Sequence, residues 1–181
     1  MTAGRPAAET LHGLPPILDA GVRVLILGSF PSPASLAAQR YYGHRQNQFW
    51  RLLGAVFDEP LAELGYAERQ RSLLRHHLGV WDVYRRCRRQ GALDAAIRSP
   101  ETNDFSRLQI EVPRLQRVCF NGQTAGRLAG WFAQQGYQTH ILPSSSPAHT
   151  LAFASKLERW QAALAPANPC SAEGEGPAGR C

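Results

Sequence analysis

Apolar residues occur along this chain in two alternating patterns. Short runs rich in valine, isoleucine, leucine and aromatic residues have the length of a strand, and they lie at 22–27, 78–84, 117–122 and 138–142. Helical segments, several of them with apolar residues at every third or fourth position, lie at about 47–57, 61–77, 123–135 and 148–164. A shorter helix is expected between Ser106, a suitable N-cap, and Pro113. Strands that alternate with helices predict an α/β fold: a three-layer α/β/α sandwich with a central four-stranded, mostly parallel sheet.

Segments that lack both patterns set the expected domain boundaries. Residues 1–20 are rich in Pro, Gly and Ala, which predicts a loosely attached N-terminal lead-in. Residues 85–105 are expected to form an irregular, basic segment, because Pro100 and Asn103 break any regular element there. Residues 166–181 contain too few apolar side chains to join a core, which predicts a disordered C-terminal tail. A single domain is therefore expected at 21–165.

Composition narrows the class of protein. A chain of 181 residues that is 44% hydrophobic can form one domain with a core. The N-terminus has no apolar signal region and the longest apolar runs have strand length, so we expect a cytoplasmic protein without membrane contact. We also expect a monomer. The cysteines, at 87, 119, 170 and 181, show no C-x-x-C spacing, which argues against a disulfide framework, a zinc site or an iron–sulfur cluster.

Positive charge gathers in one stretch of the chain. The net charge is +6, and four of the basic residues fall within five positions: Arg85, Arg86, Arg88 and Arg89. Such a cluster is typical of a surface that binds the phosphates of double-stranded DNA. A solvated surface in an arginine-rich protein has the same composition, and charge alone leaves both interpretations open.

Loops at the carboxyl ends of the predicted strands carry most of the polar candidates. Gly28, Ser29, Phe30 and Pro31 follow the first strand, where the glycine permits a tight turn and the proline ends sheet pairing. Asp82 interrupts the second strand, and it must therefore bond to backbone or to a ligand. Because ligands of open α/β sheets bind outside the carboxyl ends of the strands, we expect these loops to form one site.

The loop after the fourth strand contains three serines between two prolines. Pro143, Ser144, Ser145, Ser146 and Pro147 come just before the predicted last helix. Hydroxyl and backbone N–H groups at the positive end of a helix would form a phosphate-binding loop. An ordinary serine N-cap with flanking turn prolines is the alternative.

An aromatic cluster with one amide lies between the first two strands. Tyr42, Phe49 and Trp50 flank Asn47, so a pocket built here offers a ring face for stacking and an amide that both donates and accepts. A flat, polar ligand fits this combination. Phe49 and Trp50 also fit simple core positions, and Asn47 fits an N-cap.

Together these motifs resemble the uracil-DNA glycosylase superfamily, and most closely its hypoxanthine-DNA (deoxyinosine) glycosylase branch. The resemblance covers about residues 22–160 and is carried by LGSFPSPASL (27–36), YYGHRQNQFWRLL (41–53), GVWDVYRRCRRQGALDAAI (79–97), NDF (103–105), FNG (120–122) and LPSSSPAH (142–149). It implies a DNA glycosylase that extrudes a deaminated base from double-stranded DNA and hydrolyses its N-glycosidic bond. Hypoxanthine is the expected base. The resemblance likewise implies no metal ion or cofactor.

The resemblance also implies a role for each candidate. Gly28, Ser29, Phe30 and Pro31 match the loop that borders the extruded base, with Tyr42 as the stacking aromatic and Asn47 as the catalytic amide. Asp82 matches a polar residue at the base edge. The matches to the motif that grips the DNA backbone and leads into a minor-groove wedge are Pro143, Ser144, Ser145, Ser146, Pro147, Ala148 and His149.

Two departures from the family pattern bear on the substrate. Phe30 stands where uracil-specific members have an aspartate, and Leu142 stands where they have a catalytic histidine. Strong activity on uracil is therefore not expected. A uracil or mismatch-specific glycosylase is the enzymatic alternative, and a non-catalytic binder of damaged DNA is the alternative from another class. No lysine is a candidate for lyase chemistry, so a monofunctional enzyme is expected.

Overall fold

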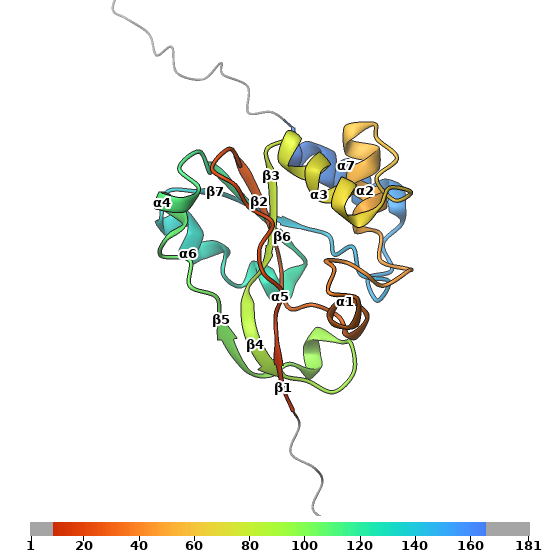
Figure 1. Cartoon of the computed structure of the whole chain (residues 1–181), viewed down its shortest axis with the longest axis vertical. Helices are drawn as coiled ribbons and strands as arrows, with labels where there is room; N and C mark the ends of the chain where they lie inside the picture. The colour runs from red at the N-terminus through yellow and green to blue at the C-terminus, as the bar shows by residue number, and fades with distance from the viewer. Residues whose placement is uncertain (1–8, 166–181) are drawn as a thin grey trace, which may run out of the picture.

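A parallel sheet of four strands forms the centre of the molecule (Figure 1). The computed structural model describes residues 9–165. Its strands are β2 (Val24–Gly28), β3 (Leu78–Asp82), β6 (Arg117–Asn121) and β7 (Gln138–Leu142), in the order β3-β2-β6-β7. All three pairings are parallel, so all four carboxyl ends lie at the same edge. The predicted sandwich and its four strands are confirmed.

Helices cover both faces of this sheet (Figure 1). One face is covered by α2 (Phe49–Phe57), α3 (Tyr66–Arg75) and α7 (Phe153–Leu164). The other face is covered by α4 (Leu108–Glu111), α5 (Gln123–Gly126) and α6 (Ala129–Gln134). The predicted helix at 123–135 is therefore two short helices, and the last helix begins at Phe153 instead of 148. A further short helix, α1 (Pro33–Ala38), follows the first loop, with Ser32 as its N-cap.

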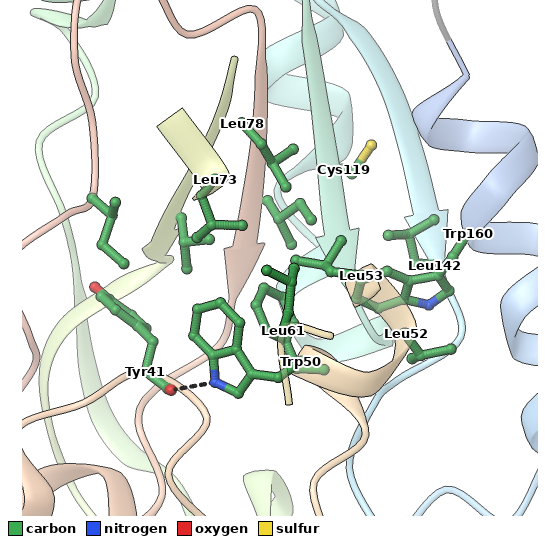
Figure 2. Packing of buried hydrophobic residues seen from close by; sticks show 14 of the residues in the cluster. Tyr41, Trp50, Leu52, Leu53, Leu61, Leu73, Leu78, Cys119, Leu142 and Trp160 are labelled. Atoms are coloured by element: carbon green, nitrogen blue, oxygen red, sulfur yellow. Dashed lines mark hydrogen bonds between the residues drawn. The ribbon is translucent and has the colours of Figure 1, made fainter. Parts of the chain in front are cut away.

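Side chains of the central strands alternate between two cores. Ile26 packs with Trp50 and Trp160 on the α2 and α7 side, while Leu25 and Leu27 pack on the α4–α6 side. Figure 2 shows the first core, where the indole Nε1 of Trp50 donates to the carbonyl of Tyr41 at 3.1 Å. Burial of strands on both faces explains their continuous apolar sequence.

A second, smaller sheet lies beyond the carboxyl edge of the first (Figure 1). It is antiparallel, with the order β1-β4-β5, and consists of β1 (Thr10–His12), β4 (Tyr84–Arg88) and β5 (Arg98–Thr102). The prediction of an irregular segment at 85–105 is therefore wrong. Local sequence hides β5 because its pairing with β4 contains two register shifts and because Pro100 lies within it.

The predicted lead-in is also more ordered than expected from residue 9 onward. Leu14 and Ile17 are each only 6% exposed, and the backbone of Ile17 pairs with that of Val80. The predicted boundary at 21 therefore cuts through packed structure. Residues 1–8 and the predicted tail at 166–181 lie outside the described residues. None of the helices between residues 9 and 165 is long and apolar enough to cross a membrane.

Candidate active site

The carboxyl ends of the four parallel strands open into a cavity of about 530 Å³. Predicted site residues from four separate segments line it, and they are Gly28, Ser29, Phe30, Pro31, Tyr42, Asn47, Asp82, Ser144, Ser145, Ser146 and His149. The structure thus brings the predicted base pocket and catalytic residue together. Pro143, Pro147 and the four clustered arginines do not line the cavity.

Gly28 is required by the close approach of two polar side chains. It is the register partner of Asp82, and a Cβ at position 28 would lie 2.5 Å from Asp82 Oδ1 and 3.0 Å from the hydroxyl of Tyr42. A real Cβ does not tolerate the shorter contact. Glycine therefore lets the carboxyl and the phenol reach the floor of the same cavity.

Asp82 is a buried carboxyl group, and one of its two oxygen atoms lacks a hydrogen-bond partner among the described residues. Its side chain is 4% exposed, and its Oδ2 forms no hydrogen bond within residues 9–165. Burial, with a smaller contribution from the nearby Asp94 carboxylate, raises the pKa of Asp82 to about 8, although Arg89 opposes the shift. At neutral pH this carboxyl holds a proton and can both donate and accept a hydrogen bond.

Tyr42 occupies an unusual backbone conformation. Its φ is 53°, in the left-handed region that bulky residues rarely adopt. One face of its ring stacks on Phe49, with centroids 3.7 Å apart and an interplanar angle of 13°. Its hydroxyl is buried without a hydrogen-bond partner in the described part of the chain, and burial raises its pKa. The strained residue therefore holds an aromatic ring at the cavity wall.

Asn47 has both a structural contact and a free donor. Its Oδ1 accepts the backbone N–H of Phe49 at 3.0 Å, just before α2 begins. This bond fixes the amide orientation, and no hydrogen bond among the described residues uses its Nδ2 group. The N-cap of α2 is Gln48, so Asn47 is not the N-cap that the sequence suggested; it lies one residue earlier and holds the backbone of Phe49 through its Oδ1.

The serine loop does not have the predicted geometry of a phosphate-binding loop at a helix N-terminus. Its serines do not open a helix, because α7 begins at Phe153. The N–H of Ser145 donates to Asn121 Oδ1 at 2.8 Å, that of Ser146 to the Ser144 hydroxyl, and that of Ala148 to the Ser146 hydroxyl. The expected N–H donors are therefore already bonded within the protein. Ser145 itself is fully buried.

The clustered arginines divide into three kinds of environment. Arg85 and Arg86 both pair with Glu101 at the exposed edge of the small sheet, and Arg88 is exposed. Arg89 instead points inward: it is 7% exposed, donates to the carbonyl of Pro31 at 2.5 Å and lies over the Phe30 ring. Its predicted surface contact with DNA is corrected to support of the first loop, because Arg89 follows the end of β4 and its guanidinium contacts Pro31 and Phe30 instead of solvent.

Sequence reasoning missed several residues that hold the site. The Asn121 amide fastens Ser145 through two hydrogen bonds of 2.8 Å. Lys156, also fully buried, donates to the carbonyl of His149 at 2.7 Å and to Gln48 at 3.0 Å. Asp94 accepts from the Ser29 hydroxyl at 2.7 Å. Of these three residues, only Asn121 could have been found from local sequence, because it lies at the end of a predicted strand. Lys156 and Asp94 reach the site through contacts between segments that are far apart in the sequence.

Comparison with known proteins places this geometry in a family. Residues 15–166 match the family model of the uracil DNA glycosylase superfamily. The chain is 40% identical over 151 residues to a hypoxanthine DNA glycosylase of Methanosarcina acetivorans, an alignment that covers 83% of this chain and 96% of the relative. A hypoxanthine DNA glycosylase of Methanosarcina barkeri is also 40% identical, with 84% of this chain and 97% of the relative covered.

A solved structure agrees with these alignments. The solution NMR structure of a candidate uracil DNA glycosylase from Methanosarcina acetivorans superposes with a TM-score of 0.80 at 38% identity, and it covers 86% of this chain and 97% of its own. The chain therefore belongs to the uracil DNA glycosylase superfamily. The predicted family is confirmed.

Proposed function

We propose that the protein is a monofunctional DNA glycosylase that hydrolyses the N-glycosidic bond of deoxyinosine and releases hypoxanthine. The observation that carries the proposal is the cavity at the strand ends, where Tyr42, Asn47 and the buried carboxyl of Asp82 meet. Two relatives at 40% identity that are hypoxanthine DNA glycosylases support the same base. The substrate is double-stranded DNA, and its target nucleotide must leave the stack to enter such a cavity.

Asp82 has the hydrogen-bonding capacity that a deaminated base requires. With its proton retained, the carboxyl offers one donor and one acceptor side by side. Hypoxanthine presents the complementary pair, N1–H and the C6 carbonyl, on one edge. An ionised carboxylate would repel that carbonyl, so the raised pKa of Asp82 favours binding of the keto edge.

Asn47 is the residue that we assign to the chemical step. When the C1′–N9 bond breaks, its electron pair stays on the purine, while water supplies hydroxide to C1′ and a proton to the released base. The unused Nδ2 of Asn47 can donate to the developing negative charge or orient the water, because its Oδ1 is already fixed by Phe49. Such a preoriented donor stabilises the transition state more than the ground state.

The first loop also fits a restricted substrate range. Phe30 is buried beneath the guanidinium of Arg89 and Leu142 is buried in the core, so neither position supplies a group that could activate water. Asn47 therefore acts without the second polar group that uracil-specific members have at these positions. This difference favours hypoxanthine release over uracil release, whereas the carboxyl of Asp82 can pair with the adjacent N–H and C=O groups of either base.

Four matched duplexes test the proposal, each with a single inosine, uracil, xanthine or G·T mismatch. With enzyme in excess, we expect the inosine strand to gain alkali-labile abasic sites fastest, and no strand breaks before alkali treatment. Faster release of uracil or thymine would make the protein a glycosylase of different specificity. Tight binding to inosine duplex without abasic sites would make it a binder of damaged DNA.

A further inference from the structure

The loop that joins β4 to β5, residues 89–97, carries an exposed apolar side chain to the rim of the cavity. Leu93 is 61% exposed and borders the same cavity as Tyr42 and Asn47. Another exposed residue, Ile110 on α4, is 77% exposed but does not line the cavity. A large apolar side chain exposed at the mouth of a cavity favours contact with a partner.

This hairpin loop is held to the base pocket by two hydrogen bonds, and a third bond lies within the loop. Arg89 at its start donates to the carbonyl of Pro31, and Asp94 next to Leu93 accepts the hydroxyl of Ser29. At its far end, Arg98 donates to the carbonyl of Ala95 at 2.7 Å. The loop therefore holds Leu93 at a fixed place relative to the first loop of the cavity.

Two arginines frame the hairpin loop. Arg88 and Arg98 are direct cross-strand partners, both exposed, and neither forms an ion pair within residues 9–165. Like charges opposite each other weaken a strand pair. A phosphate bound between them would remove the repulsion and form charge-assisted hydrogen bonds.

We propose that the hairpin loop is a second DNA-contacting element, in which Leu93 inserts into the base stack beside the extruded nucleotide. Arg88 and Arg98 then bind the flanking phosphates. Extrusion leaves a gap in the duplex, and an apolar side chain inserted there replaces part of the lost stacking. This inference rests on the proposed function, because only an enzyme that extrudes a base from duplex DNA needs such a wedge.

The experiment compares duplex and single-stranded forms of one inosine oligonucleotide. Single-turnover excision is measured for the wild type, Leu93→Ala, Leu93→Met and the control Ile110→Ala. We expect Leu93→Ala to slow duplex excision by about tenfold, since one inserted side chain offsets part of the unstacking cost. Excision from the single strand should change by less than about twofold, because that substrate has no duplex stack to open.

The other variants separate a wedge from a merely structural role. Leu93→Met keeps an apolar side chain of similar volume and should retain the duplex rate, and Ile110→Ala should match the wild type on both substrates. An unchanged duplex rate in Leu93→Ala would overturn the proposal. So would an equal loss on duplex and single strand, because it would show that Leu93 supports the pocket itself.

A fluorescent duplex keeps this test independent of excision. 2-Aminopurine placed beside the inosine brightens when its stacking is disrupted, and the wild type should raise this signal more than Leu93→Ala does. If the wild type releases no hypoxanthine from either substrate, the proposed function fails, while the fluorescence difference still decides the wedge. An identical signal for the two proteins would reject the wedge even where excision is normal.

Discussion

The two sheets of this protein differ in burial, and they contribute differently to the site of the proposed base excision. The parallel sheet is covered on both faces by helices, and its carboxyl edge positions the buried Asp82 and the loops around it. The small antiparallel sheet exposes Arg86 and Arg88 on β4, and its hairpin loop reaches the rim of the same cavity. Burial in the first sheet sets the chemistry of the pocket. In the second sheet Arg86 is paired with Glu101, whereas Arg88 forms no ion pair among residues 9–165 and is the charge that we expect to bind a DNA phosphate.

Contacts between the sheets make them one site. The strand that ends at Asp82 continues through Val83 into β4, and the N–H of Tyr84 donates to the carbonyl of Ser29 at 3.0 Å. The first loop therefore pairs with the small sheet on one side and belongs to the parallel sheet on the other. A DNA contact at β4 and a base contact at the first loop are expected to be coupled through this short connection.

The largest expected effect is a loss of excision rate when Asn47, beside the carboxyl edge of the parallel sheet, is replaced. Asn47→Ala should slow single-turnover excision of hypoxanthine by ~10²-fold or more, because it removes a donor that acts mainly in the transition state. Binding to a duplex with 2′-fluorinated deoxyinosine, which resists cleavage, should change little. Quench-flow excision assays and equilibrium binding with this analogue measure the two quantities.

Asn47→Asp separates catalysis from the structural hydrogen bond to Phe49. Its carboxylate keeps an acceptor for the N–H of Phe49, so the melting temperature should match that of the wild type. Excision should be lost as in Asn47→Ala, because aspartate offers no N–H and repels the departing base. Wild-type excision in Asn47→Asp would show that the oxygen, and not the amide nitrogen, performs the work.

The sequence predicts these two sheets with unequal success for a physical reason. Strands buried on both faces must be apolar along their length, so β2 and β6 are visible in isolation. β4 and β5 contain arginines and Pro100; β4 pairs with the distant β1, and β5 pairs with β4, the strand before it in the chain. Such pairing leaves no local signal, since strand propensity depends strongly on context.

The next largest effect tests whether the ring of Tyr42 at the cavity wall stacks on the extruded base. Tyr42→Ala should weaken capture of the extruded base by ~1–3 kcal/mol, the range for stacking of one base on an aromatic ring. Tyr42→Phe should be nearly neutral, because the deleted hydroxyl has no hydrogen-bond partner in the described chain and the stack on Phe49 remains. Affinity for the fluorinated inosine duplex measures both, and an equal loss in the two variants would assign the effect to the hydroxyl.

The sequence predicts those site residues whose chemical character stands out from their neighbours in the chain. Asn47 and Tyr42 stand close together between two strands, and Asp82 is conspicuous as an acid inside an apolar run. The inward turn of Arg89 and the anchoring of the serine loop by Lys156 depend on which faces meet after folding. A charge count treats Arg88 and Arg89 alike, although burial separates their roles.

A pH series tests the burial of Asp82 on a smaller scale. The carboxyl is flanked by Asp94, Arg89 and Tyr42, and its pKa is raised from 3.8 to about 8 in the folded protein. Between about pH 4 and pH 8 the folded state therefore binds a proton that the unfolded state releases, so this group stabilises the fold at low pH and the stabilisation fades as pH rises. The contribution to the slope is at most about 1.4 kcal/mol per pH unit.

Asp82→Asn is the matched control for that series. Its neutral amide cannot titrate, so urea unfolding between pH 5 and pH 8 should show a shallower loss of stability than in the wild type. Excision by the wild type should also decline as pH rises through about 8, where the carboxyl ionises. Parallel stability curves for the two proteins would show that Asp82 is ionised in the folded state.

The smallest expected effect concerns the small sheet and its exposed charge. Arg88→Ala should flatten the slope of log binding constant against log salt concentration by about 0.9, because each phosphate contact releases about that many counterions. Arg75→Ala removes the same charge just before β3 begins, at the opposite edge of the parallel sheet, and should leave the slope unchanged. Titrations with an inosine duplex and with an undamaged duplex should give parallel slopes, since phosphate contacts carry no base information. If both variants flatten the slope equally, the positive charge acts through the net charge of the molecule, and the contrast between the two edges disappears.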